Sequence, residues 1–324
     1  MKILSTLSLL FLSILGTAQD ISIHDTYSKE PVPFATISFG DGMGTFANGK
    51  GVFRFSKKLY PQVDTLFISS IGYQDLKVAA LNLKEQIDLI PKASRLETVV
   101  VTTELTGKFK IEDIKPIVHK EYEDCWLPTV ESEIAVKFDR VDGKPTTISK
   151  LEFPILLEKS QRSKKGKLRK FSTLFRLQFY DVEPDGSPSF TSYYPSQTFI
   201  ITQESDKVYE LDVTDLRISI PKNGIFAAIQ VLGYAKPNGD LINEKKYREI
   251  KTRTGYTRVS TTYRPLLPFT DKMKGKNTWV RKVFVNDKKW QLFDLEFNPL
   301  SKLVRSGNND YAMGAELKVY ERQE

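Results

Sequence analysis

A stretch near the N-terminus, Pro31 to Tyr73, limits the folds open to this chain more than any other part of it. Residues 34–39 place their side chains alternately on two faces, and a period of two is typical of a β-strand. Several glycines and Asn48 then supply turns, and short apolar runs follow at 52–55 and 65–69. Short strands separated by glycine- and proline-rich turns predict an antiparallel β-sandwich.

Three groups of residues in this stretch resemble the carboxypeptidase-like regulatory domain. They are Pro31, Pro33, Ala35 and Ile37; Gly44, Thr45, Gly51 and Phe53; and Asp64, Leu66, Ile68, Ser69, Ile71, Gly72 and Tyr73. The resemblance covers roughly residues 20–103 and implies a transthyretin-like, seven-stranded β-sandwich. The family usually opens with Gly-x-Val-x-Asp, whereas this chain has Ser22, Ile23, His24 and Asp25 there, without the first glycine.

The length of 324 residues predicts two domains, each with enough chain to bury a core. We expect a signal peptide at 1–18, the regulatory sandwich at 19–103, a connector at 104–128 and a C-terminal domain at 129–324. In the connector Ile111, Ile114 and Val118 recur at roughly helical spacing, and Pro116 limits any helix to one short piece.

The C-terminal domain returns to strand patterns separated by turn dipeptides such as Asp142-Gly143 and Asn238-Gly239. The expected strands are 131–138, 148–157, 171–182, 199–202, 208–213, 225–232, 278–285, 289–297 and 315–320. So many strands in about 200 residues predict a larger, jelly-roll-like β-sandwich. The whole chain is therefore expected to be all-β.

Residues 1–18 have the form of a secretory signal peptide. Lys2 supplies the positive start, 3–15 a short apolar run, and Gly16 and Ala18 the small residues before a cut. Cleavage is expected before Gln19, and no cysteine stands there to carry a lipid. No second apolar stretch is long enough to span a bilayer, so no transmembrane segment is expected in the mature chain. We expect an exported protein, and the family resemblance implies the periplasm or outer membrane of a Bacteroidota-type bacterium.

The segment Leu96-Glu-Thr-Val-Val-Val-Thr102 ends the regulatory domain. In the family's best-known setting such a segment precedes a TonB-dependent outer-membrane receptor and resembles the TonB box. We expect no receptor barrel in the residues that follow, and a β-branched run fits a closing strand without further assumptions. We therefore interpret Val99–Val101 as a strand.

Few groups in the chain are suited to catalysis. The only histidines are His24 and His119, and neither belongs to a His-x-x-Glu zinc motif, so the family's enzymatic name does not carry over. There is no Gly-x-Ser-x-Gly elbow. The single Cys125 has acidic neighbours, Glu123 and Asp124, which should raise its pKa and leave it inert. The prediction is a non-enzymatic protein without a cofactor. The alternative is an unrecognised, glycosidase-like hydrolase that uses two carboxylates of the C-terminal domain.

Acidic residues at 181, 183 and 185 resemble the first half of a calcium loop. The twelfth position is Ser192, where a bidentate Glu would be required. A hairpin turn explains the same residues, so no metal site is predicted there.

Partner binding is the remaining function class. The densest basic run spans Lys159–Lys170, and a solvated loop is its simplest explanation. Attraction to an acidic envelope protein or glycan is the functional alternative, since an exported protein is not expected to meet nucleic acid. Exposed aromatic rings could stack on sugars, although burial in the sheet is their more frequent fate. The candidate partner-binding residues are Lys164, Lys165, Lys167, Tyr193 and Tyr194. The oligomeric state stays open.

Overall fold

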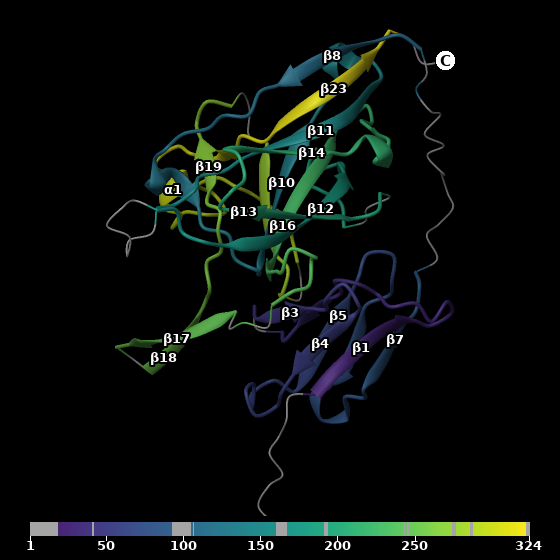
Figure 1. Ribbon diagram of the computed structural model, residues 1–324, viewed down its shortest axis with the longest axis vertical. Coiled ribbons are helices and arrows are strands. Elements are labelled where there is room, and N and C mark those ends of the chain that lie inside the picture. The colour runs from purple at the N-terminus through teal and green to yellow at the C-terminus, as the bar shows by residue number, and fades with distance from the viewer. Residues whose placement is uncertain are drawn as a thin grey trace, which may run out of the picture.

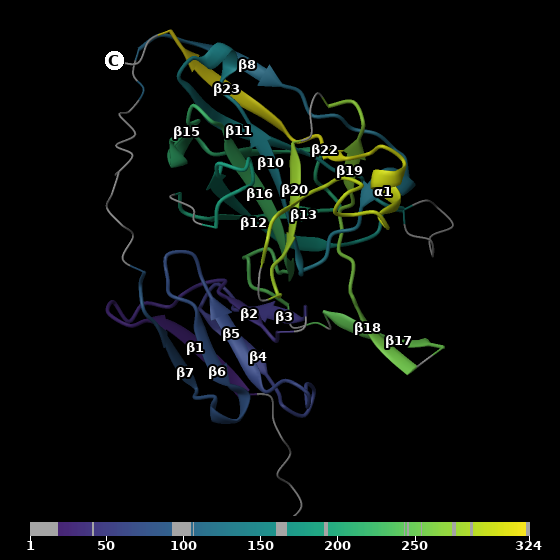
Figure 2. The same cartoon turned by 180° about the vertical axis from the view of Figure 1, so that it is seen from behind.

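The computed structural model describes residues 19–40, 42–92, 105, 107–159, 167–190, 194–242, 244, 246–253, 255–273, 277–285 and 288–321. The predicted signal peptide and the segment Val99–Val101 lie outside these residues. The described chain is all-β, as predicted, and forms a smaller N-terminal body and a larger one (Figures 1 and 2). Within the described ranges, no helix has the length and apolar character needed to cross a membrane.

The smaller body contains two sheets built from residues 19–89. One sheet has the order β4-β1-β7 and the other the order β3-β2-β5-β6. The strands are β1 (Gln19–Asp25), β2 (Thr36–Ser38), β3 (Gly44–Phe46), β4 (Val52–Phe55), β5 (Thr65–Ser69), β6 (Leu76–Ala79) and β7 (Gln86–Leu89). Their apolar residues, among them Ile21, Ile37, Phe53 and Leu66, form one buried cluster. The purely antiparallel expectation is wrong at one place, because β7 runs parallel to β1.

The larger body packs a six-stranded sheet against a five-stranded one. The first has the order β13-β12-β16-β10-β20-β21, and the second the order β14-β11-β23-β8 with β15 beside β11. The strands of the first are β10 (Ser132–Phe138), β12 (Ser172–Asp181), β13 (Gln197–Thr202), β16 (Ile225–Tyr234), β20 (Thr278–Lys282) and β21 (Gln291–Leu292). Those of the second are β8 (Phe109–Ile114), β11 (Thr146–Pro154), β14 (Val208–Asp212), β15 (Ile218–Ser219) and β23 (Gly314–Tyr320). One large apolar cluster lies between the sheets.

Two smaller sheets and a short helix complete the larger body. A three-stranded sheet has the order β22-β19-β9, and β17 pairs with β18 alone. Their bounds are β9 (Cys125–Trp126), β17 (Tyr247–Thr252), β18 (Gly255–Ser260), β19 (Leu267–Thr270), β22 (Asp310–Tyr311) and α1 (Lys302–Arg305).

The helical expectation for the connector is wrong. Residues Phe109–Ile114 form strand β8, which pairs antiparallel with β23 along its whole length. The reason is tertiary: β23 offers a free row of backbone donors and acceptors, and burial of that row requires a partner. Pro116 follows the strand, where it removes no ladder hydrogen bond. The expected strand 289–297 is also shorter than predicted, because only Gln291–Leu292 pair.

The two bodies meet along β2 and β3. The ring of Phe46 is 3% exposed and joins the apolar cluster of the larger body, with its centroid 5.2 Å from that of Phe284. The hydroxyl of Ser38 donates to the Phe284 carbonyl at 2.6 Å. At Gly44 an added Cβ would stand 2.4 Å from both the Ile37 carbonyl oxygen and the Phe284 ring, so only glycine fits. Both faces of β2 are therefore buried, one by its own sandwich and one by the larger body.

Candidate functional site

A two-stranded hairpin, β17–β18, stands apart from the other sheets of the larger body (Figures 1 and 2). Its base is held by three contacts. The Tyr247 hydroxyl accepts from the Gly44 amide at 2.7 Å and donates to the Gly44 carbonyl at 3.2 Å. The Ser260 hydroxyl donates to Glu131 at 2.5 Å, and the Arg258 guanidinium lies 5.7 Å from the centre of the Tyr60 ring. These contacts fix where the hairpin begins and leave its outer half in solvent.

Positive charge is concentrated in two segments of the chain. Residues 159–170 contain seven basic and no acidic residues, and residues 245–258 contain six basic residues and one acidic residue. The net charge of the whole chain is +8, so everything outside these two segments carries a net charge of −4. Charge gathered in this way attracts anions far more strongly than the same charge spread evenly over the surface.

The two basic segments rise from a common base. Glu158, just before the first segment, accepts from Arg264 at 2.5 Å and pairs with Arg169 at 3.5 Å. The Tyr234 amide donates to Glu244, just before the second segment, at 2.9 Å. Burial raises the pKa of the Tyr234 hydroxyl, Arg169 of the first segment lowers it, and Glu244, just before the second segment, raises it. We call the described parts of the two segments, 167–170 and 246–258 without residue 254, the basic surface.

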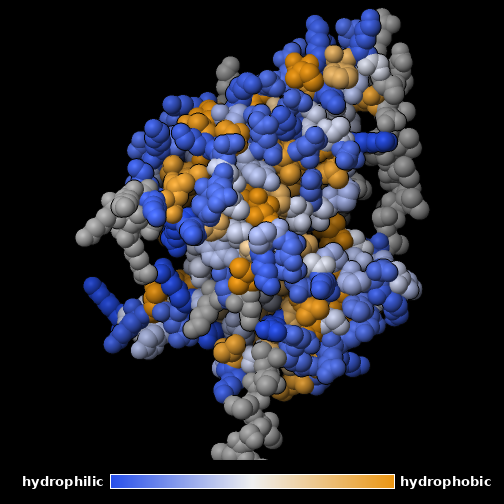
Figure 3. All heavy atoms as spheres, viewed as in Figure 1, coloured by the Kyte–Doolittle hydropathy of each residue, from blue (hydrophilic) through white to orange (hydrophobic). Residues whose placement is uncertain are grey.

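The basic surface also exposes apolar groups. Tyr256 is 74% exposed and Ile250 is 41% exposed, and both lie on the hairpin. Hydrophilic side chains dominate the same region in the space-filling view (Figure 3). A charged surface with a solvated aromatic ring is well suited to protein recognition, because it combines long-range attraction with contact area.

The predicted partner-binding residues differ in exposure, and some of them lie outside the described residues. Lys164, Lys165 and Tyr193 lie outside the described residues, and Lys167 is exposed. Tyr194 is half-buried: its ring lies 5.8 Å from that of Phe179, and its hydroxyl contacts the Ser219 backbone. Burial raises the pKa of the Tyr194 hydroxyl. Its expected exposure is therefore wrong, since its ring belongs to the packing of the larger body.

Three more aromatic residues of the larger body, Tyr256, Tyr263 and Trp290, lie near strand ends and are further candidates for stacking on a sugar. Tyr263 is fully buried, and Trp290 packs edge-on against Tyr180. Tyr256 is the exposed member of the group, and it lies on the hairpin that the sequence interpretation missed. The signal was present in the alternation of Tyr256, Arg258 and Ser260 after Gly255, but the many charged neighbours resembled a loop.

A pocket of about 300 Å³ lies at the junction of the two bodies. Its lining includes Ser69 and Asp75 from the smaller body and Lys288 from the larger one. The Lys288 ammonium donates to the Ser69 hydroxyl at 2.7 Å, and burial lowers its pKa, while Asp75 opposes that shift. Asp75 is the one carboxylate in the described lining, so this pocket lacks the pair that glycoside hydrolysis by acid and base requires.

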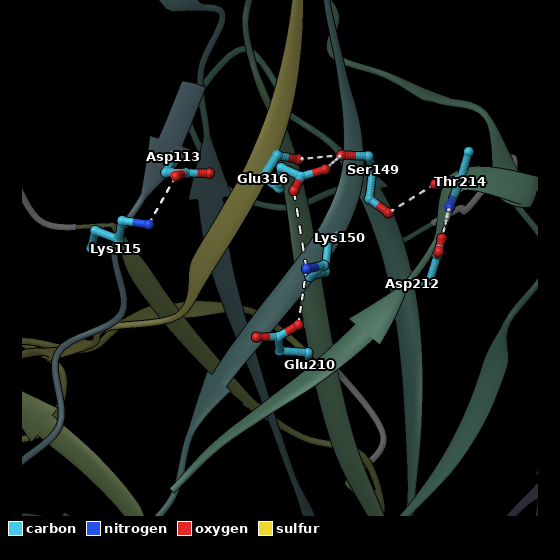
Figure 4. Close-up of polar contacts among 8 residues, drawn as sticks. All are labelled: Asp113, Lys115, Ser149, Lys150, Glu210, Asp212, Thr214 and Glu316. Atoms are coloured by element: carbon cyan, nitrogen blue, oxygen red, sulfur yellow. Dashed lines mark hydrogen bonds and ion pairs between the residues drawn. The ribbon is translucent and has the colours of Figure 1, made fainter. Parts of the chain in front are cut away.

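The outer face of the five-stranded sheet carries a ladder of charges (Figure 4). Lys150 lies between Glu210 at 2.9 Å and Glu316 at 4.0 Å, and Ser149 donates to Glu316 at 2.6 Å. Glu152 stands opposite Glu210 across the strands, and burial, followed by Glu210, raises the pKa of Glu152. Two facing carboxylates are what the hydrolase alternative needs. However, Lys150 pairs with one of them, and the ladder has the alternating charges typical of a solvated sheet face.

The outer face of the six-stranded sheet holds a buried polar cluster beside the small body. Arg281 donates to Glu133 at 2.7 Å and to the Tyr180 hydroxyl at 2.9 Å, and that hydroxyl donates to Glu133 at 2.9 Å. The Arg281 guanidinium also stacks 4.4 Å from the centre of the Trp290 ring. Burial acts to lower the pKa of the Arg281 guanidinium, but the attraction of Glu133 and then Tyr180 outweighs it, so the pKa is raised. This closed network stabilises the sheet and offers no free group to a substrate.

Metal chemistry finds no support among the described residues, where no three His, Cys, Asp or Glu side chains gather closely enough to hold an ion. The Nε2 atom of the His119 ring is hydrogen-bonded to the carbonyl oxygen of Phe269, at a distance of 2.8 Å. The acidic residues at 181–185 form a turn in which Asp185 accepts from Ser187, as the hairpin interpretation predicts.

Cys125 is a buried thiol that donates to the Glu121 carbonyl at 3.2 Å. Burial is the largest cause that raises its pKa to about 12, followed by Asp124 and Glu121. The predicted direction is confirmed, although Glu121 and not Glu123 is the second acidic neighbour.

We expect native Cys125 to react with iodoacetamide roughly a hundredfold or more slowly at pH 8.5 than the same thiol in urea, because the thiolate is the nucleophile. The folded thiol holds its proton more tightly than the unfolded one. Its contribution to stability is therefore complete below about pH 8.5 and is lost as the pH rises toward about 12. Mass spectrometry of the labelled protein measures the rate at which Cys125 is alkylated. Equal rates in buffer and in urea would contradict the raised pKa of the folded thiol.

No family model matches this chain, and no curated protein or solved structure matches it either.

Proposed function

We propose that this chain is a non-catalytic, exported protein of the bacterial envelope that binds an acidic partner protein through its basic surface. The observation that carries the proposal is the charge distribution: two short segments hold a net charge of +12, and the remainder of the chain is net acidic. Arg169 of the first segment lies near Tyr234, whose amide donates to Glu244 just before the second segment. An evenly basic protein would attract anions without choosing an orientation, whereas a local basic surface orients its partner.

The proposed domain identities fit this role. The smaller body is proposed to be a transthyretin-like sandwich of the carboxypeptidase-like regulatory type, and the larger body a jelly-roll-like sandwich. The contacts of Phe46 and Ser38 with Phe284 support a rigid connection between them. The leader-like residues 1–18 support export to the periplasm or outer membrane. In this proposal the smaller body supports the base of the hairpin, and the larger body presents the basic surface.

Reversal of charge in either basic segment should weaken binding of an acidic probe. The probe is a fluorescein-labelled, glutamate-rich peptide, and its anisotropy reports binding. The loop variant changes Lys164, Lys165 and Lys167 to Glu, and the hairpin variant changes Arg248, Lys251 and Arg253 to Glu. Each variant should raise the dissociation constant roughly tenfold or more, since each exposed ion pair contributes about 0.2–1 kcal/mol. Binding by the native protein should also weaken as salt shortens the Debye length from about 10 Å to about 3 Å.

A matched control changes Lys50, Lys58 and Lys84 to Glu, three exposed lysines of the smaller body. It alters the net charge by the same amount and should bind the probe nearly as well as the native protein. Equal losses in all three variants would assign binding to net charge alone and would contradict the proposal. Pull-downs from envelope extract with the same proteins would then identify the partner, and the N-terminal mass of the native protein would test cleavage before Gln19.

A further inference from the structure

The hairpin of the basic surface has two unpaired edges. Within the described chain, β17 and β18 pair with each other and with no third strand. Such an edge presents a row of backbone donors and acceptors that readily pair with another chain. Most proteins protect their edges by covering or shortening them, and a two-stranded ribbon is only marginally stable without support. Here the ribbon is held at its base through Tyr247 and Ser260, and its outer half stays uncovered.

The hydrogen-bond pattern shows which backbone groups of β17 face outward. In an antiparallel pair, every second residue directs its N–H and C=O to the partner strand and the others direct theirs away. The Thr261 amide donates to the Lys246 carbonyl at 2.8 Å, and 247 stands opposite 260 in the next pair. Residues with even numbers on β17 therefore pair with β18, and the backbone groups of Glu249 and Lys251 point to the free edge.

The edge of β17 is more open than that of β18. Residues 248–251 of β17 are all exposed, whereas residues 258–260 of β18 are half-buried against the rest of the protein. The exposed side chain of Ile250 lies on the face opposite to Tyr247, where it adds an apolar contact for a neighbouring strand. The β17 edge is thus the better site for an added strand.

The charges around this edge select its occupant. Arg248 and Lys251 lie on β17 itself and Arg253 in the turn that follows, while Glu249 is the one acid of the strand. Cross-strand neighbours of opposite charge stabilise a sheet, and like charges destabilise it. An extended segment rich in Asp or Glu is therefore favoured over a neutral or basic one.

We propose that the free edge of β17 binds an extended, acidic segment of the partner protein as a third, hydrogen-bonded strand. This rests on the proposed function and names how the basic surface recognises its partner. Backbone hydrogen bonds from Glu249 and Lys251 provide affinity and register, and Arg248, Lys251 and Arg253 provide selection for acidic residues.

Two substitutions of Glu249 distinguish binding by strand addition from binding by charge attraction alone. Glu249→Pro removes an outward N–H and one negative charge, and proline is tolerated at an edge whose N–H faces solvent. Glu249→Thr removes the same charge and keeps the N–H. Attraction by charge alone predicts that both variants bind the acidic peptide as tightly as the native protein or more tightly. Strand addition predicts that Glu249→Thr binds at least as tightly, whereas Glu249→Pro binds roughly tenfold more weakly.

A second measurement leaves the protein unchanged, in case proline disturbs the hairpin. The native protein is titrated with a ten-residue peptide of alternating Glu and Val and with the same peptide carrying N-methyl groups on alternate residues. Methylation on the edge that faces β17 should weaken binding roughly tenfold, and methylation on the other edge should have little effect. Equal affinity for both methylated peptides, or for the proline and threonine variants, would overturn the strand-addition proposal.

The outcomes also distinguish this proposal from the proposed function. If the charge-reversal variants lose binding while backbone changes have no effect, the basic surface binds by charge and only strand addition fails. If the native protein does not bind the acidic peptide, both proposals fail. If dextran sulfate binds equally to the native and proline proteins and displaces the peptide completely, the surface is assigned to anionic polysaccharide, which also overturns strand addition.

Discussion

Replacement of Arg281 by Met should lower the free energy of unfolding by about 3–5 kcal/mol, the cost typical of removing one partner from a buried ion pair. The change leaves the Glu133 carboxylate, whose side chain is 1% exposed, without its cation inside the sheet surface. The change also removes the hydrogen bond that Arg281 donates to the Tyr180 hydroxyl, and it removes the cation that stacks on the Trp290 ring. Urea unfolding followed by circular dichroism gives the free energy from the midpoint and slope.

The next residue in the chain is a matched control. Lys282 lies on the same strand but is mostly exposed, and its nearest carboxylate oxygen, on Glu131, is 3.8 Å away. Lys282→Met should therefore cost no more than about 1 kcal/mol. The double change Glu133→Leu with Arg281→Met should recover much of the lost stability, because no buried charge is left unpaired. A loss below about 1 kcal/mol for Arg281→Met alone would show that the network is more hydrated than its geometry indicates.

Replacement of Phe284 by Ala should cost about 3–5 kcal/mol and should weaken the connection between the two bodies. The Phe284 ring is completely buried and packs on Phe46, and its backbone carbonyl accepts from Ser38 and from the Gly42 amide. Calorimetry should show the native protein unfolding as one transition and the variant as two, since two bodies that lose their shared contacts unfold separately.

Phe53→Ala is the comparison for this experiment. Phe53 is 3% exposed and lies in the core of the smaller body, so its loss should also cost about 3–5 kcal/mol. It makes no contribution to the cluster shared with the larger body, and the two bodies should stay coupled. A single, unsplit transition for Phe284→Ala would mean that the polar contacts of β2 and β3 suffice to hold the bodies together.

The strands of the fold were largely predictable because their patterns are local. The long runs at 172–181 and 225–234 are apolar enough to be recognised as strands from the sequence, and both are central in the six-stranded sheet. Strand β8 was not predictable, because charged residues alternate with Ile111 and Ile114 at a spacing that also fits a helix. Its partner β23 is far away in the sequence, and only the assembled sheet decides between the two structures.

The positive charge of the candidate site could be predicted from the sequence, but the contacts that place its residues in space could not. The basic run Lys159–Lys170 is visible in the sequence, but the pairing of Glu158, which precedes it, with Arg264 joins residues that lie more than a hundred positions apart. The burial of Tyr194 and the exposure of Tyr256 likewise depend on which neighbours pack beside each ring. Residue type alone does not distinguish a ring in the core from a ring in solvent.

The position of β23 has a consequence for the order of events during synthesis. This strand lies between β11 and β8, and every one of its partners precedes it by more than 160 residues. The five-stranded sheet therefore cannot close until residues 314–320 have been made, and the core beneath it stays uncovered until then. Pairings of such long range form slowly and leave apolar strands accessible in the meantime. The larger body can therefore complete its fold only after nearly all of its chain has been made, and its apolar strands stay accessible to other chains until then.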